Sequence, residues 1–267
     1  MSGDLRNIVD GIAERVVLED LASTSYGAES LARYLFAAQW APGRRVVDLC
    51  CGIGYGTSLM LAAGATSAAG IDVSPEAIAE AQRRFARLGA EFSVNDVSAH
   101  IDIEDAQLRV CFEGLEHVSD ADGLLDNLRR RLSPDGVAIV STPNGALHAS
   151  GHSGNPHHER EYALPEFEDL LQARFAHVRM FFQWRYPDPH DVDWTLARAV
   201  RAVIPVRIKH AVRRRTSVSA GHSPAFADAG PISALDYRPL PASYLRLPPG
   251  LRFGEPSIWI AVCRTGK

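Results

Sequence analysis

Residues 46–56 read Val-Val-Asp-Leu-Cys-Cys-Gly-Ile-Gly-Tyr-Gly, an apolar β-branched run followed by three glycines spaced two apart. The run predicts a buried strand over 45–49, and the glycines predict a turn whose backbone can approach a ligand closely. A helix predicted to open at Thr57 would point its first N–H groups at an anionic or carboxylate-bearing ligand. Glycines alone are a weak signal, because tight turns use them for backbone reasons. The unit therefore predicts a strand–loop–helix ligand site that needs support from the rest of the chain.

Acidic residues at the ends of the next strands give that support. The strand predicted over 67–72 ends at Asp72, about twenty residues beyond the glycine loop, where a carboxylate can accept both hydroxyls of a ribose. Asp96 follows a third strand, predicted over 91–95. Either acid alone could equally be a helix cap or a loop residue. Together with Asp48 on the first strand, they predict a nucleoside-bearing cofactor.

The remaining chain alternates between strand and helix patterns. Strands are expected at 45–49, 67–72, 91–95, 108–112, 137–141, 177–182 and 257–263. Helices are expected at 5–20, 26–40, 57–63, from Ser74-Pro75-Glu76 onward, at 121–132 and at 165–173, with Pro134-Asp135-Gly136 as a turn. This α/β alternation predicts a doubly wound, mostly parallel sheet of seven strands, with ligand sites at the carboxyl ends of the strands.

The composition excludes several classes of protein. The 267 residues, 46% of them hydrophobic, suit one α/β domain with an insertion or a small lid. No apolar run is long enough to span a bilayer, and the first ten residues lack the apolar core of a signal peptide. Four cysteines, two of them adjacent in the glycine loop, form neither a disulfide framework nor a zinc pattern, so a reduced, cytoplasmic protein is expected. The net charge of −4 argues against a general nucleic-acid binder.

Residues 186–250 break the alternation. The stretch 194–215 looks like a basic amphipathic helix interrupted near Pro205, and 217–250 is rich in Pro, Gly and Ser. Two interpretations stay open: a solvated helix with a surface loop, or an inserted lid or dimerisation segment. The expected organisation is N-terminal helices closing over the cofactor (1–42), a cofactor-binding core (43–185), the insertion (186–250) and the final strand of the core (251–267).

The glycine loop resembles motif I of class I S-adenosylmethionine (SAM) methyltransferases, D-x-G-x-G-x-G, with Cys50 where the first glycine usually stands. The resemblance covers roughly residues 26–183 and the last strand, and it implies a Rossmann-like methyltransferase fold with SAM as cofactor. The residues that it implies for SAM binding are Tyr26, Arg33, Asp48, Gly52, Gly54, Asp72, Val73, Asp96, Val97 and Glu113. Within this set, Asp48, Gly52 and Gly54 would hold the methionine part of SAM, Asp72 would take the ribose hydroxyls, and Val73, Asp96 and Val97 would lie beside the adenine.

A second motif follows the strand predicted over 108–112. Residues 113–117 read Glu-Gly-Leu-Glu-His, and positions i, i+3 and i+4 of a helical segment share one face. Glu113, Glu116 and His117 can therefore converge. Two carboxylates at one place repel each other unless a proton or a cation lies between them, which favours a metal ion. A second cluster, at 155–162, follows the strand at 137–141 and is expected to border the same site.

This pairing resembles the small-RNA 2′-O-methyltransferases, which place a divalent ion on E-x-x-E-H and a later histidine. The ubiquinone-biosynthesis O-methyltransferases share the E-x-x-E-H part, and the overall layout is most similar to bacterial methyltransferases of glycan and sugar biosynthesis. The resemblance implies a metal site of Glu113, Glu116, His117 and His158. Carboxylates with imidazoles fit Mg²⁺ or Mn²⁺. The alternative is that Glu116-His117 forms only a structural turn.

The predicted function is SAM-dependent, metal-assisted O-methylation of a sugar, oligosaccharide or glycosylated metabolite. An aliphatic hydroxyl is a very weak acid, and a divalent ion would orient it and lower its pKa. His117, His157, His158 and Glu161 are the candidate catalytic residues, with His157 or Glu161 accepting the proton. Methylation of a phenolic or quinoid molecule is the first alternative, RNA 2′-O-methylation a less favoured one, and a non-catalytic SAM-fold subunit the last. A small-molecule or oligosaccharide acceptor and a homodimer are the expected partners.

Overall fold

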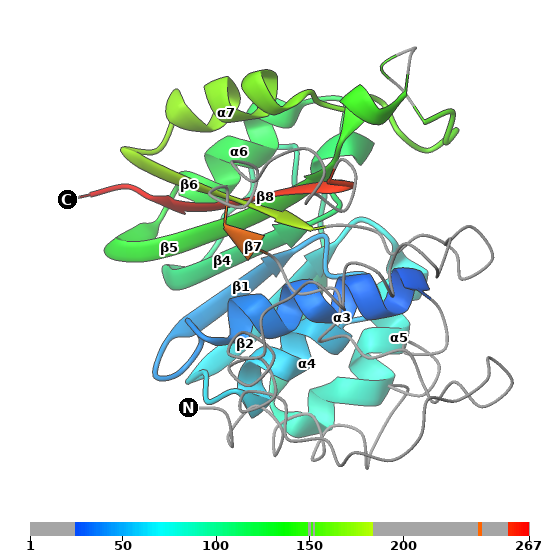
Figure 1. The fold of residues 1–267 in the computed structure, drawn as a ribbon. Coiled ribbons are helices and arrows are strands. Elements are labelled where there is room, and N and C mark those ends of the chain that lie inside the picture. Colours follow the sequence, from blue (N-terminus) through cyan, green and yellow to red (C-terminus); the bar gives the residue numbers. More distant parts are fainter. Residues whose placement is uncertain (1–24, 149–150, 152, 184–239, 242–255, 267) are drawn as a thin grey trace, which may run out of the picture.

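The computed structural model describes residues 25–148, 151, 153–183, 240–241 and 256–266, and in them one mixed sheet carries the fold (Figure 1). Its order is β3-β2-β1-β4-β5-β8-β6-β7. The strands are β1 (Arg45–Leu49), β2 (Ser67–Asp72), β3 (Ala90–Val94), β4 (Ala106–Phe112), β5 (Leu132–Pro143), β6 (His177–Gln183), β7 (Leu240–Pro241) and β8 (Ile258–Arg264). The first five strands are parallel, whereas β8 is antiparallel to both β5 and β6. The predicted seven-stranded, mostly parallel sheet is confirmed, and β7 adds a two-residue edge.

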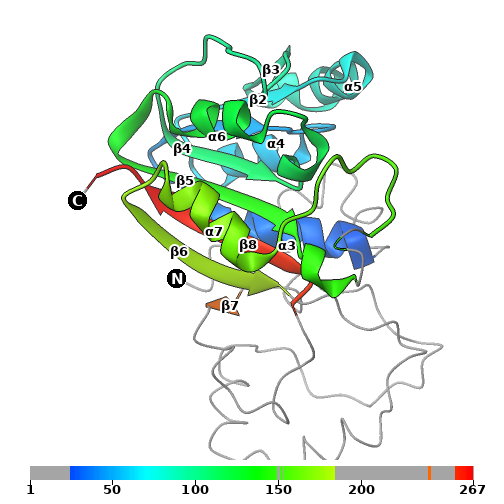
Figure 2. The same cartoon turned by 90° about the horizontal axis from the view of Figure 1, so that it is seen from above.

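Helices cover both faces of this sheet. They are α3 (Ser25–Ala38), α4 (Tyr55–Ala62), α5 (Pro75–Phe85), α6 (Ala121–Arg129) and α7 (Leu164–Gln172), with short 3₁₀ turns η1 (Ala86–Leu88), η2 (Leu115–His117) and η3 (Gly145–Leu147). Figure 1 shows α6 and α7 on one side and α3 and α4 on the other, and Figure 2 shows the layers from above. No helix of the described residues is long and apolar enough to cross a membrane.

The central strand β4 shows how the sequence makes two core layers. Leu108, Val110 and Phe112 pack into the cluster that includes α3 and α4, whereas Cys111 belongs to the cluster of α6 and α7. Successive side chains of a strand point to opposite faces, so a near-continuous apolar run serves both layers. Because helices cover both faces of the sheet, a ligand site is expected at the ends of the strands.

Element boundaries follow the sequence closely where the signals are local. β1 and β2 have the predicted bounds, and α5 begins as expected, with the Ser74 hydroxyl accepting the Ala77 N–H at 3.1 Å. The predicted turn at 134–136 instead lies within β5. Ala106 pairs with Leu132 and Leu108 pairs with Val137, so residues 133–136 form a bulge in a longer strand. The predicted helices at 5–20 and 194–215 lie outside the described residues.

Candidate active site

The glycine loop connects β1 directly to α4, and its glycines have different roles. A Cβ on Gly54 would lie 2.6 Å from Cε1 of Phe92, and one on Gly56 would lie 2.0 Å from Cε1 of Tyr34, so packing requires both glycines. Gly52 differs. Its φ is +53°, and no atom of the described residues lies within 4 Å of the place a Cβ would take. Gly52 therefore faces open space in which a ligand could lie against the backbone.

Asp48 lies beneath this loop and is fully buried. Its carboxylate accepts the Thr57 hydroxyl at 2.8 Å and the Tyr34 hydroxyl at 3.2 Å. Burial raises the pKa of Asp48 to about 7, although the hydrogen bonds from Thr57 and Tyr34 oppose the shift. Through these hydrogen bonds Asp48 connects β1 to α3 and to the start of α4. Sequence reasoning assigned it to direct contact with the methionine part of SAM, and these contacts give it a supporting position.

This buried carboxyl group predicts an unusual pH dependence of stability. The pKa of about 7 exceeds the ordinary value of 3.8, so the folded state holds the proton more tightly than the unfolded state. Protonated Asp48 therefore stabilises the folded state at low pH, and this stabilisation is lost as the pH rises to about 7. Relative to wild type, Asp48→Asn is expected to gain about 3 kcal/mol between pH 5 and pH 8, since the loss covers the two pH units from 5 to the pKa of about 7 and each unit corresponds to about 1.4 kcal/mol. Urea denaturation of both proteins at the two pH values measures this, and an unchanged difference would contradict it.

Asp72 ends β2 and joins two loops. Its carboxylate accepts the backbone N–H of Gly52 at 2.8 Å and that of Ser74 at 3.0 Å. An ionised carboxylate has about four acceptor positions, so two remain for hydroxyl groups. Val73 is 65% exposed, and Val94, which pairs with Asp72, is 45% exposed. Both side chains therefore expose apolar surface close to Asp72, where a flat ring could pack against it.

The other residues predicted to bind the cofactor divide by exposure. Asp96 is exposed and accepts the Ser98 N–H and hydroxyl, which lower its pKa. Val97 is buried in the core, so only its backbone could meet a ligand. Tyr26 lies in α3, but its side chain is outside the described part of the chain.

Arg33 of α3 is 1% exposed and donates from Nη1 to Oε1 of Gln183 at 2.7 Å. The Gln183 amide in turn donates to the Glu29 carbonyl at 2.9 Å. Nε of Arg33 meets no acceptor among the described residues. Its positive charge lies close enough to Glu116 to oppose the rise in the pKa of that residue. A buried guanidinium with an unused donor is suited to an anionic group of a ligand.

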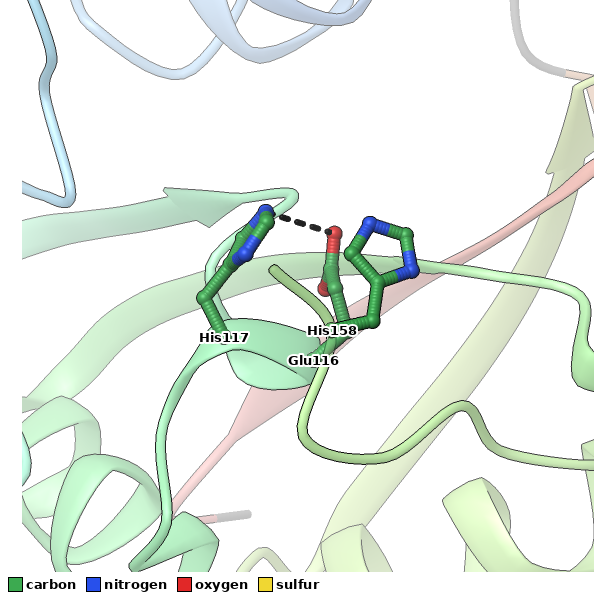
Figure 3. A group of neighbouring side chains, drawn as sticks. All are labelled: Glu116, His117 and His158. Atoms are coloured by element: carbon green, nitrogen blue, oxygen red, sulfur yellow. Dashed lines mark ion pairs between the residues drawn. The ribbon is translucent and has the colours of Figure 1, made fainter. Parts of the chain in front are cut away.

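Glu116, His117 and His158 form the only group of three metal-type ligands found among the described residues, with ligand atoms within 4.8 Å of one another. The Glu116 side chain is buried, and Oε2 accepts the Thr142 hydroxyl at 3.1 Å. Oε1 has no hydrogen-bond partner within the described ranges and lies 3.9 Å from Nε2 of His117. Figure 3 shows the two imidazole rings on either side of this carboxylate. Burial, and next the charge of Glu113, raise the pKa of Glu116 well above its ordinary value.

Backbone hydrogen bonds bring these residues together from segments about 40 positions apart. The Glu116 carbonyl accepts the N–H groups of Glu159 at 2.7 Å and Arg160 at 3.3 Å. Nδ1 of His117 meets the His157 carbonyl at 2.8 Å. The loop after β5 is thereby fixed against η2, and His158 is placed beside His117, with ring centroids 4.8 Å apart.

Two residues of the predicted constellation lie outside this trio. Glu113, at φ 51°, accepts the Ser141 hydroxyl at 2.7 Å through Oε1. His157 is exposed, and its carbonyl oxygen holds His117. Sequence reasoning missed Thr142 as a partner of Glu116, although the Ser-Thr-Pro-Asn run at the end of β5 was a usable signal. Cys50, which the sequence places where a glycine usually stands, adopts a left-handed backbone at φ 62°.

Glu161 is buried and accepts three hydrogen bonds. They come from the Ser153 backbone N–H at 3.0 Å, the Ser153 hydroxyl and Nδ1 of His158 at 2.5 Å. Burial alone would raise the pKa of Glu161, but the hydrogen bonds from Ser153 and His158 outweigh it, and the pKa is lowered. Glu161 is therefore a carboxylate enclosed by donors, which makes it a poor acceptor for a substrate proton.

The fold is that of a methyltransferase domain. Residues 24–198 match the family described as "Methyltransferase domain", and the chain belongs to that family.

Individual relatives agree with this membership. A "Probable S-adenosylmethionine-dependent methyltransferase" of Mycolicibacterium smegmatis is 32% identical over 144 residues, covering 52% of this chain and 54% of the relative. A "Ubiquinone biosynthesis O-methyltransferase" of Actinobacillus pleuropneumoniae is 32% identical over 117 residues, covering 40% and 49%. An S-adenosylmethionine-dependent methyltransferase structure from Mesorhizobium loti superposes with a TM-score of 0.54 at 15% identity, covering 90% of this chain and 100% of that one, and shows the fold. The chain spans about half the length of the curated relatives it matches.

Proposed function

We propose that this protein is a SAM-dependent O-methyltransferase that acts, with the help of a divalent cation, on a hydroxyl of a sugar, oligosaccharide or glycosylated metabolite. The observation that carries the proposal is the convergence of Glu116, His117 and His158 beyond β4 and β5. β4 lies next to β1, whose glycine loop provides the cofactor side of the site, and β5 lies next to β4. Ligands of doubly wound folds bind at this edge of the sheet. The family membership supports methyl transfer as the reaction class.

The residues at this edge fit SAM. Gly52 leaves room against the backbone, Asp72 has acceptor positions for the ribose hydroxyls, and Val73 and Val94 offer an apolar surface to the adenine. Arg33 has an unused Nε for the carboxylate of the methionine part. When bound, SAM supplies an electrophilic methyl group on its sulfonium. The chain's own residues orient that group and keep the adenosine at the β2 edge.

The trio likewise fits a divalent cation of the Mg²⁺ or Mn²⁺ type. Glu116 has a buried oxygen without a hydrogen-bond partner in the described structure, and both histidines have Nδ1 engaged, so that Nε2 is the nitrogen that would bind an ion. On His158 the ion would replace the Asn155 amide, which now lies 2.9 Å from Nε2. A bound ion would lower the pKa of a substrate hydroxyl, and two adjacent hydroxyls of a sugar could both reach it. Of the predicted proton acceptors, His157 is exposed, whereas Glu161 is enclosed, so His157 is the better candidate.

A phenolic or quinoid acceptor is the second candidate, favoured by the similarity to ubiquinone-biosynthesis O-methyltransferases over 117 residues. A phenol is a stronger acid than an aliphatic alcohol and needs less help to lose its proton. The two functions therefore differ in how strongly the reaction depends on the cation.

An acceptor screen with methyl-labelled SAM tests the proposal. Purified protein is first titrated with SAM by calorimetry and then incubated with oligosaccharides carrying adjacent hydroxyls, with catechols and with short RNAs, each with and without Mg²⁺. Transfer to the oligosaccharides, dependent on the ion, is the expected result. Transfer to catechols alone would replace the sugar by the second candidate, and transfer to RNA alone would contradict both. Failure to bind SAM would contradict the cofactor assignment.

A further inference from the structure

The sequence predicts Glu161 as an acceptor of the substrate proton, but its hydrogen bonds indicate a different role. Its side chain is 1% exposed, and its two oxygens already accept the Ser153 N–H, the Ser153 hydroxyl and His158 Nδ1. An ionised carboxylate can only accept hydrogen bonds, so Nδ1 of His158 must carry a proton. The contact of 2.5 Å between Nδ1 and Oε1 therefore decides how the imidazole is protonated.

The other ring nitrogen gives the same answer. The amide nitrogen of Asn155 lies 2.9 Å from Nε2 of His158, and an amide N–H can only donate. Nε2 therefore has a lone pair, and the ring is the neutral form with hydrogen on Nδ1. Figure 3 shows one nitrogen of the His158 ring directed toward the Glu116 carboxylate and the other directed away from it.

His117 is arranged in the same manner from the opposite side. Its Nδ1 meets the His157 carbonyl oxygen at 2.8 Å, which can only accept, so in the neutral ring Nε2 has the lone pair. That Nε2 lies 3.9 Å from Oε1 of Glu116. Two independent acceptors, one backbone and one carboxylate, thus place hydrogen on both Nδ1 atoms, so that both Nε2 lone pairs lie near the same carboxylate oxygen; on His158 a metal ion would take the lone pair that the Asn155 amide now meets.

We infer that Glu161 is a positioning residue, which holds His158 in the form with hydrogen on Nδ1 and thereby presents Nε2 to the centre formed with Glu116 and His117. The role of His158 in metal binding rests on the proposed function, whereas the position of its hydrogen rests only on the hydrogen bonds to Glu161 and Asn155. A carboxylate behind a ligating histidine fixes the ring and raises its basicity, and losing such a partner lowers metal affinity about 10- to 100-fold.

The change Glu161→Gln tests this with the side-chain shape preserved. The Ser153 backbone N–H lies 3.0 Å from Oε2 and can only donate, so it favours the glutamine oxygen at that position. The glutamine NH₂ group then takes the Oε1 position and faces Nδ1 of His158. The Ser153 hydroxyl can rotate to accept, but Nδ1 can accept only by giving up its proton. The proton of His158 is therefore expected to move to Nε2, and the partly exposed Asn155 amide, which donates to Nε2 in wild type, is expected to turn away.

The first measurement is ¹⁵N NMR of histidine-labelled, metal-free protein, with the His158 signals assigned by their loss in His158→Gln. Wild type is expected to show hydrogen on Nδ1, and Glu161→Gln is expected to show it on Nε2. Glu159→Gln, a change of an exposed acid two positions away, should leave the wild-type pattern intact. Hydrogen on Nε2 in wild type, or the same form in both proteins, would overturn the inference.

The second measurement is the affinity for Mn²⁺, followed by the electron paramagnetic resonance of the free ion. Glu161→Gln is expected to weaken binding about 10- to 100-fold, and Glu159→Gln is expected to leave it unchanged. If wild type binds no Mn²⁺, the proposed metal assistance fails, and the NMR result alone decides the role of Glu161. If wild type binds Mn²⁺ and Glu161→Gln binds it equally well, the positioning role is overturned while metal assistance stands. A folded Glu161→Ala variant, without any acceptor for Nδ1, should weaken binding at least as much.

Discussion

Replacing Asp72 by alanine is expected to raise the Kd for SAM about a hundredfold in a protein that remains folded. A hydrogen bond to a charged group contributes about 1.5 kcal/mol or more, so two bonds from a ribose contribute about 3 kcal/mol. Each 1.4 kcal/mol corresponds to a factor of about ten in Kd. Calorimetric titration measures the change. Asp135→Ala is the matched control, because this exposed aspartate lies in the first part of β5, away from the carboxyl ends of the strands.

Asp72 also accepts the N–H groups of Gly52 and Ser74, so its loss could weaken SAM binding through the loops alone. Ligands that differ only in the ribose separate the two effects. Wild type is expected to bind 5′-methylthioadenosine more tightly than the 2′-deoxy analogue, and Asp72→Ala is expected to lose this discrimination. If the variant discriminates as well as wild type does, Asp72 acts on the loops and does not hold the ribose.

The sequence predicts the sheet well because its signals are local. Alternation of apolar runs with turn residues fixes β1 and β2, and Ser74-Pro75 fixes the start of α5. The side-chain contacts of Asp48 follow from the same periodicity. Val46 faces the layer of α3 and α4, and Asp48, two residues on, shares that face. It therefore points toward Tyr34 and Thr57, as observed.

The site was harder to predict, because it depends on long-range contacts and unusual backbone. The spacing within 113–117 suggested that Glu113 and Glu116 converge, but Glu113 adopts a left-handed backbone at φ 51°, and its carboxylate accepts the Ser141 hydroxyl. Non-glycine residues adopt this conformation rarely, and no local sequence pattern predicts it. The approach of His158 depends on the Glu116 carbonyl accepting two N–H groups from 159–160, a pairing that sequence spacing does not encode.

Removal of divalent metal is expected to abolish methyl transfer while sparing SAM binding. The physical reason lies in the trio. Glu116 keeps a buried oxygen without a hydrogen-bond partner in the described structure, and such a group is costly unless a cation or a proton joins it. His117 and His158 each direct Nε2 toward that oxygen. After dialysis against EDTA, transfer to an aliphatic hydroxyl should be lost, and Mg²⁺ or Mn²⁺ should restore it.

Single substitutions in the trio should reproduce the effect of the chelator. Glu116→Gln, His117→Ala and His158→Ala are each expected to lower kcat by about two orders of magnitude or more, with the Kd for SAM little changed, because the lost interaction acts on the acceptor hydroxyl. His177→Ala is the matched control, since this exposed histidine begins β6, at the end of the sheet opposite to the carboxyl ends of the parallel strands. Chelator sensitivity together with full activity of all three variants would place the ion elsewhere. Full activity in metal-free buffer would remove the cation from the reaction and leave a histidine to take the proton unaided.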